Sequence, residues 1–134
     1  MDMDSLLPEP MPWGANDAEA TELCRRWMIY LGASDTVVAS GDDRRACDLY
    51  SSRYLGWVDN RMGNLEVELV ERSASVAIAD GRAAVIFVRR GVLPAARQRA
   101  DELGVAILGF DPQDAALDGA NLLGREVCAS GLAD

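Results

Sequence analysis

Hydrophobic residues recur along the chain in two patterns, one typical of helices and one typical of strands. Over residues 18–30 the apolar positions repeat every three or four residues, which predicts an amphipathic helix. Asn16 followed by Glu19 forms a capping-box pattern at its start, and Gly32 is suited to its end. Trp27 falls on the apolar face of this helix, so we expect it in the core.

The rest of the chain predicts a sheet with further helices. Three strand-like runs follow the first helix, at residues 36–40, 46–51 and 53–60. Two continuous apolar runs, typical of strands covered on both faces, lie at residues 83–88 and 105–110. Further helices are predicted at residues 65–80 (with Asn64 as cap), 94–103 and 118–128. The order α-β-β-β-α-β-α-β, with a C-terminal helix, predicts an α/β fold: a mixed sheet flanked by helices.

Length and composition predict one globular domain. The chain has 134 residues, of which 49% are hydrophobic and 6% aromatic. We divide it into an N-terminal tail (1–15), a folded domain (16–112) and a C-terminal helix or tail (113–134). The proline-rich tail leaves two interpretations open: a loosely attached segment, or a short motif that anchors a partner through Leu6, Leu7 and Trp13.

The charged residues of the chain exclude several classes of function. The net charge is −9, and all 13 basic residues are arginine, because the chain has neither lysine nor histidine. A phosphate-binding P-loop needs lysine, and Ser-His-Asp or Cys-His catalysis needs histidine, so these mechanisms are excluded. An acidic balance favours a protein partner or a small ligand over strong, sequence-independent DNA binding.

The cysteines and the hydropathy indicate the cellular compartment. Cys24, Cys47 and Cys128 have no CxxC spacing, and an odd count predicts free thiols in a reducing, cytoplasmic setting. No apolar run approaches the roughly 18 residues of a membrane span, so we expect no membrane association. The abundance of Ala, Arg, Gly and Asp favours a bacterial or phage source.

Several segments together resemble the Mrr branch of the PD-(D/E)XK nuclease superfamily. The first helix ends in Leu-Gly, and the strand Ala-Cys-Asp-Leu at 46–49 resembles the family's Gly-hydrophobic-Asp-hydrophobic segment. Gly-Trp-Val-Asp-Asn at 56–60 stands where the family carries its Gln-x-Lys strand. Later segments match the family's next strand, its Ala-spaced helix and its last strand, at residues 85–88, 94–100 and 105–108. The resemblance implies a restriction-endonuclease-like fold.

The resemblance also implies a degenerate active site. In that family an Asp and a Glu or Gln hold Mg²⁺, and a Lys activates the attacking water and stabilises the phosphate. Asp48 matches the first ligand, and Glu22 could match an acidic residue on the first helix. Trp57 replaces the second ligand with a group that only donates, and Asp59 puts a negative charge where the Lys belongs. We therefore expect the chain not to be an enzyme and to need no cofactor, with Mg²⁺ relevant only to residual nuclease activity.

Two interpretations of Asp59 stay open. Trp57, Asp59 and Arg61 alternate onto one face of their strand, and if that face meets Asp48 the two carboxylates form a candidate metal pair. Glutamates of the next helix would join that site: Glu66 or Glu68. In the alternative, Asp59 is solvated or pairs with a nearby arginine, Arg61 or Arg53.

Arginine pairs give a second candidate surface. Four of these residues lie at loop or strand ends and could form a DNA-binding patch: Arg44, Arg45, Arg89 and Arg90. The alternative is that they pair with the many acidic side chains.

Three functions remain. The first is an inactive nuclease-like domain that binds a protein partner or itself in a bacterial or phage nucleic-acid-related pathway. The second is a DNA-associated protein or residual Mg²⁺-dependent endonuclease. The third is an acidic DNA mimic or inhibitor of a DNA-binding protein.

Overall fold

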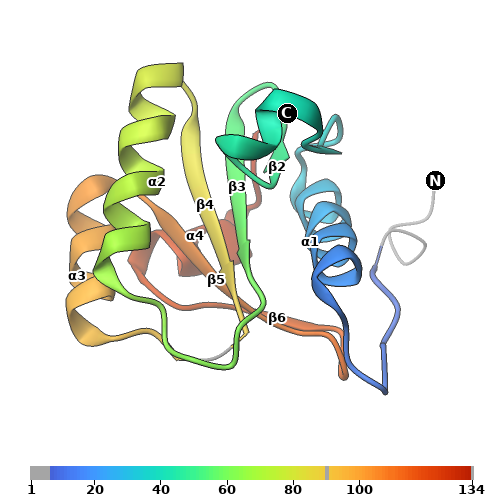
Figure 1. Cartoon of the computed structure of the whole chain (residues 1–134). Coiled ribbons are helices and arrows are strands. Elements are labelled where there is room, and N and C mark those ends of the chain that lie inside the picture. Colours follow the sequence, from blue (N-terminus) through green and yellow to red (C-terminus); the bar gives the residue numbers. More distant parts are fainter. Residues whose placement is uncertain (1–6, 90, 134) are drawn as a thin grey trace.

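A mixed sheet forms the middle layer of the structure (Figure 1), a computed structural model that describes residues 7–89 and 91–133. Within these residues the sheet has six strands, whose spatial order follows the chain. They are β1 Val37–Val38, β2 Leu49–Tyr50, β3 Tyr54–Asp59, β4 Ala83–Val88, β5 Ala106–Asp111 and β6 Ala116–Gly119. The central strands β3, β4 and β5 are parallel, and β1, β2 and β6 pair antiparallel to their neighbours.

Helices cover both faces of this sheet (Figure 1), which confirms the predicted α/β class. They are α1 Asp17–Leu31, α2 Val67–Asp80, α3 Pro94–Leu103 and α4 Leu122–Ser130. Helices α2 and α3 pack on one face, and α1 and α4 pack on the other. Neighbouring residues of the buried strand β4 alternate between the two cores, with Ile86 in one and Val85 and Phe87 in the other. This burial on both faces explains the continuous apolar runs of the central strands.

Helix α1 begins and ends as its sequence predicts. The Asn16 side chain accepts a hydrogen bond from the Glu19 amide (2.8 Å), and the Glu19 side chain accepts one from the Asn16 amide (3.0 Å). Gly32 ends the helix with a φ of +127°, a conformation that favours glycine. Trp27 is buried, so its predicted place in the core is confirmed.

Two predicted boundaries near the site are wrong. The strand predicted at 46–51 is only β2, because the 3₁₀ helix η2 Gly41–Arg45 and its cap Ala46 precede it. Helix α2 begins after Glu66, and the Asn64 side chain is not its cap. Residues 41–43, which separate the first two predicted strands, therefore begin a helical turn.

The predicted C-terminal helix is present as α4, but it begins later than expected, and a strand precedes it. Residues 116–119, expected partly as helix and partly as tail, form β6 and pair with β5. Asn121 explains where the chain turns into α4. Its buried side chain accepts hydrogen bonds from the amides of Ile107 (3.0 Å) and Gly124 (2.8 Å) and donates one to the carbonyl of Val105 (2.7 Å). It therefore caps α4 and ties its start to β5.

The N-terminal segment is neither helix nor strand from residue 7 to residue 16, yet it contacts the domain. The Met11 amide donates to the Pro112 carbonyl (2.7 Å). The Met11 side chain packs against the hydrophobic core between α1 and the sheet, called the α1 core below. Of the proposed anchors, Leu6 lies outside the described residues, while Leu7 and Trp13 are exposed. No helix in the described part of the chain is long and apolar enough to cross a membrane.

Candidate functional site

A cleft of about 740 Å³ opens beside the carboxyl end of β3. Its walls come from α1, from the end of η2 and the segment that leads to β2, from β3 and from α2. Three residues singled out from the sequence, Asp48, Trp57 and Asp59, all line it. Its charged lining residues are Asp17, Arg44, Arg45, Asp48, Asp59, Arg61, Glu66, Glu68 and Arg72. The cleft therefore carries both signs of charge in nearly equal number.

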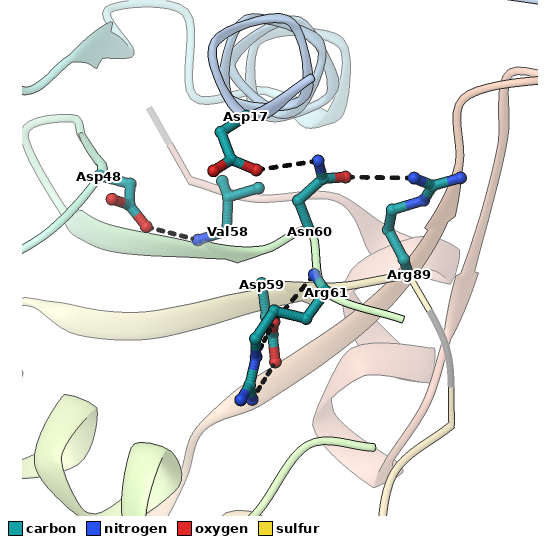
Figure 2. Close-up of polar contacts among 7 residues, drawn as sticks. All are labelled: Asp17, Asp48, Val58, Asp59, Asn60, Arg61 and Arg89. Atoms are coloured by element: carbon teal, nitrogen blue, oxygen red, sulfur yellow. Dashed lines mark hydrogen bonds and ion pairs between the residues drawn. The ribbon is translucent and has the colours of Figure 1, made fainter. Parts of the chain in front are cut away.

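Asp48 lies where strands β2 and β3 part. Its amide donates to the Gly56 carbonyl (2.9 Å), and its carboxylate Oδ2 accepts from the Val58 amide (2.7 Å; Figure 2). The side chain thus replaces the backbone acceptor that a longer β2 would have supplied. Its other oxygen, Oδ1, lies 3.2 Å from the Arg44 guanidinium. Both carboxylate oxygens of Asp48 therefore have a partner within the chain.

Asp59 is the buried acid of the cleft, with only 4% of its side chain exposed. The Arg61 guanidinium donates to both of its oxygens, at 2.8 and 3.0 Å, and the Arg61 amide donates at 3.2 Å. The hydrogen bond to Asp59 raises the pKa of Arg61 above its ordinary value. Two interpretations were open for Asp59, a metal pair with Asp48 or an ion pair with a nearby arginine. The structure shows the ion pair, with Arg61.

Figure 2 shows how the two acids are oriented. Asp48 lies beside the edge of β3, in line with the strand, where it meets the Val58 amide. Asp59 projects with Arg61 from one side of β3, and Asp17 and Asn60 meet on the other side. Asp48 and Asp59 line the same cleft, but each is turned toward its own partners.

Trp57 closes the floor of the cleft. It is 7% exposed and packs in the core beneath α2. Its indole N–H donates to the Ala46 carbonyl at 2.9 Å. The residue that stands in place of a second metal ligand is therefore a structural side chain, and the one polar group it has is already bonded.

The donor set does not fit Mg²⁺. This ion prefers several oxygen ligands in octahedral geometry, and Trp57 offers none. In the described part of the chain, no group of three Asp, Glu, Cys or His side chains could hold a metal. Glu66 and Glu68 line the cleft but do not complete such a group with Asp48 and Asp59.

Glu22 has a role apart from the cleft. It lies on α1, is not among the residues that line the cleft, and pairs with Arg25 at 2.6 Å and Arg26 at 3.5 Å. The hydrogen bond from Arg25 lowers the pKa of Glu22 below its ordinary value. The structure therefore does not bring Glu22 to the acids of β2 and β3.

The four candidate DNA-binding arginines have different surroundings. Arg44 and Arg45 line the cleft, and Arg44 pairs with Asp48. Arg89 directly follows β4 and donates to the Asn60 side chain at 3.5 Å. Arg90 lies outside the described residues. Arg45 makes no ion pair among the residues that the structure describes.

Sequence reasoning missed two polar residues near the cleft, Asn60 and Arg72. Asn60 donates from its side chain to the Ala15 carbonyl and to Asp17, both at 3.1 Å, and so holds the N-terminal segment against β3. Arg72 lines the cleft from α2 and, like Arg45, makes no ion pair among the described residues. The only signal was position, since Asn60 directly follows Asp59 and Arg72 lies one helical turn after Glu68.

Comparison with known proteins gives no match, whether with protein-family models, with curated proteins or with solved structures. The resemblance to the Mrr branch therefore stays a prediction from the sequence. Function has to be inferred from the geometry and charge of the cleft and of the surrounding surface.

Proposed function

We propose that this chain is a restriction-endonuclease-like domain without nuclease chemistry, which acts as a binding or self-associating module in a bacterial or phage nucleic-acid-related pathway. In this proposal the cleft beside β3 is the position of a former active site. Its residues now stabilise the domain, and binding takes place through the surface.

The order of elements supports the first half of the proposal. The helix α1, the strands β1 to β3 and the alternation α2-β4-α3-β5 follow the order that the sequence resemblance implies. Asp48 directly precedes β2, Asp59 ends the neighbouring strand β3, and both line one cleft, as we expect of a nuclease-derived site. The additional β6 and α4 extend this arrangement at the other edge of the sheet.

The state of the two carboxylates is the observation that carries the proposal. Arg44 and the Val58 amide take the two oxygens of Asp48, and Arg61 takes both oxygens of Asp59. A phosphodiester transition state needs positive charge from a metal or a lysine. Here Arg44 and Arg61 neutralise the chain's own acids, and the chain has no lysine.

A cleavage assay tests this proposal. Supercoiled plasmid is incubated with the full chain and Mg²⁺ or Mn²⁺, beside the Asp48→Asn variant. We expect no nicked or linear product from either protein. The asparagine keeps an oxygen that can accept from the Val58 amide, so the variant should stay folded. Cleavage by the wild-type chain that Asp48→Asn abolishes would overturn the proposal.

The mass of the protein in solution distinguishes self-association from binding to a different protein. Light scattering of the purified chain should give a defined oligomer if the module associates with itself. It should give the mass of one chain if the partner is a different protein. A polydisperse aggregate at all concentrations would contradict both.

A nucleic-acid-associated role is a second candidate, favoured by Arg45 and Arg72. These guanidinium groups line the cleft from η2 and from α2 and make no ion pair among the described residues. Two unpaired cations on facing elements can contact successive phosphates. A DNA mobility shift that falls steeply with salt and weakens in Arg45→Ala and Arg72→Ala would support this role. Absence of binding at low salt would exclude it.

A further inference from the structure

Trp13 is the most exposed large apolar side chain of the described residues, at 94%. It sits in a turn in which the Gly14 amide donates to the Met11 carbonyl at 2.9 Å. The other tryptophans, Trp27 and Trp57, are 4% and 7% exposed. An indole left wholly in water contributes little to folding, and its face is free to contact a partner.

The backbone around Trp13 is anchored on both sides. Before it, the Met11 amide is bonded to the Pro112 carbonyl at 2.7 Å, and Met11 packs into the α1 core. After it, the Ala15 carbonyl accepts from the Asn60 side chain at 3.1 Å. The turn therefore presents the indole from a fixed backbone, and a preorganised aromatic side chain loses little entropy on binding.

The two chain segments that meet at this turn are acidic, with Arg89 near them through its hydrogen bond to Asn60. No arginine or lysine precedes Arg25 in the sequence, and none lies between Arg99 and Arg125. Acidic side chains flank the turn and the β5–β6 connection that it touches: Glu9, Asp111 and Asp114. None of these acids makes an ion pair among the described residues. This contrasts with the cleft, where Asp48 and Asp59 each have an arginine partner.

We infer that the Trp13 turn is a docking surface for a basic segment of another protein, one that bears arginine or lysine. A guanidinium or ammonium group would lie on the face of the Trp13 indole, where the ring attracts cations. Neighbouring basic residues would meet Glu9, Asp111 and Asp114. An acidic partner segment would be repelled by the same carboxylates.

This inference deepens the proposed binding role, on which it rests, by naming the chemistry of the partner. It does not depend on the chemistry of the cleft. If the basic peptide described below fails to bind while plasmid stays uncleaved, the proposed function stands and this inference falls. If plasmid is cleaved, the nuclease-derived half of the proposal falls whatever the peptide does.

A labelled peptide tests the inference. The probe is a fluorescein-labelled, end-blocked decapeptide of alternating Arg and Gly, and its anisotropy is followed as the full-length chain is added at low salt. A decapeptide of alternating Glu and Gly is the control ligand. The protein variants are Trp13→Ala, Asp114→Asn and, as a matched loss of an exposed apolar side chain on α2, Ile78→Ala (71% exposed).

We expect the Arg peptide to bind and the Glu peptide not to bind. Trp13→Ala should weaken binding about tenfold, because the cation–π contact and the aromatic anchor are lost together. Asp114→Asn should weaken binding about two- to threefold, and Ile78→Ala should leave it unchanged. Acrylamide quenching of the exposed tryptophan should fall in the wild-type complex.

Three results would overturn the inference. One is equal affinity of Trp13→Ala and the wild-type chain, which would place any binding elsewhere. Another is no binding of the Arg peptide at low salt. The third is protection of Trp13 from acrylamide by raising the concentration of the chain alone, which would assign the surface to a second copy.

Discussion

Two tryptophans mark two regions that use charge in opposite ways. Trp57 is buried on the floor of the cleft, with its indole N–H bonded to the Ala46 carbonyl at 2.9 Å. Two acids of this cleft have internal cationic partners, Asp48 with Arg44 and Asp59 with Arg61. Trp13 is exposed, and the acids around it make no ion pair among the described residues.

This difference separates stability from recognition. A charge that is already paired supports the fold, because removing its partner leaves it uncompensated, and it has little left to offer a ligand. An unpaired charge beside an exposed aromatic ring does the reverse. The cleft should therefore respond to mutation mainly through the free energy of unfolding, and the Trp13 turn mainly through binding.

The largest effect should come from a matched pair of truncations. Trp57→Ala removes a buried ring and leaves a cavity, which should lower the free energy of unfolding by about 3–5 kcal/mol. Trp13→Ala should change it by less than about 0.5 kcal/mol, because the ring is already in water. Urea denaturation followed by circular dichroism measures both. Similar losses for the two variants would remove the contrast between the regions.

The buried ion pair should give the next largest effect. Arg61→Ala leaves the Asp59 carboxylate buried without its cation, and we expect a loss of about 2 kcal/mol at neutral pH. Adding Asp59→Asn to Arg61→Ala should recover part of that loss, since the unpaired charge is gone. Arg45→Ala, in the same cleft but without an ion pair, is the control and should change stability by less than about 0.5 kcal/mol. An equal loss for Arg45→Ala and Arg61→Ala would contradict the account.

Asp48 should show a smaller effect that depends on the substituted group. Asp48→Ala removes the acceptor for the Val58 amide, and we expect a loss of about 1–2 kcal/mol. Asp48→Asn keeps an acceptor oxygen and should lose less. Thermal unfolding of the two variants side by side checks the order. A more stable Asp48→Ala would mean that the carboxylate is strained in the cleft.

The exposed ion pairs of Glu22 should give the smallest effect. Arg25 lowers the pKa of Glu22 in the folded chain, so the pairing stabilises the fold above the unfolded pKa. That contribution is lost as the pH falls from the unfolded pKa of glutamate, about 4.3, through the lower pKa of Glu22 in the folded chain. Because the side chains are partly exposed, Glu22→Gln should cost no more than about 0.5 kcal/mol at pH 7. A stability difference from wild type that grows as the pH falls would have the wrong sign.

Local signals in the sequence predicted most of the fold. Capping residues and glycines set the ends of α1, and Gly81 and Gly104 end α2 and α3 with positive φ. The strand β6 escaped prediction because its four residues, Ala-Leu-Asp-Gly, have no apolar run and lie at the edge of the sheet. The start of α4 depends on Asn121 bonding to β5, a contact that no periodicity reveals.

The location of the site could be predicted from the sequence, but the contacts of its side chains could not. The family-like order of Asp48, Trp57 and Asp59 indicated which strands would meet at a cleft. The partners of these residues depend on tertiary structure, such as the bond from Trp57 to a carbonyl eleven residues earlier. Asn60 reaches Ala15 across 45 residues, so the attachment of the N-terminal segment had no local signal.

Titration with Mn²⁺ shows whether the cleft is a metal site. Mn²⁺ is titrated into the full chain and followed by the electron paramagnetic resonance signal of the free ion, beside Asp48→Asn. We expect no stoichiometric binding at the cleft, because arginines and backbone amides already hold the oxygens of Asp48 and Asp59. One Mn²⁺ bound per chain, and lost in Asp48→Asn, would contradict it and restore the cleft as a metal centre.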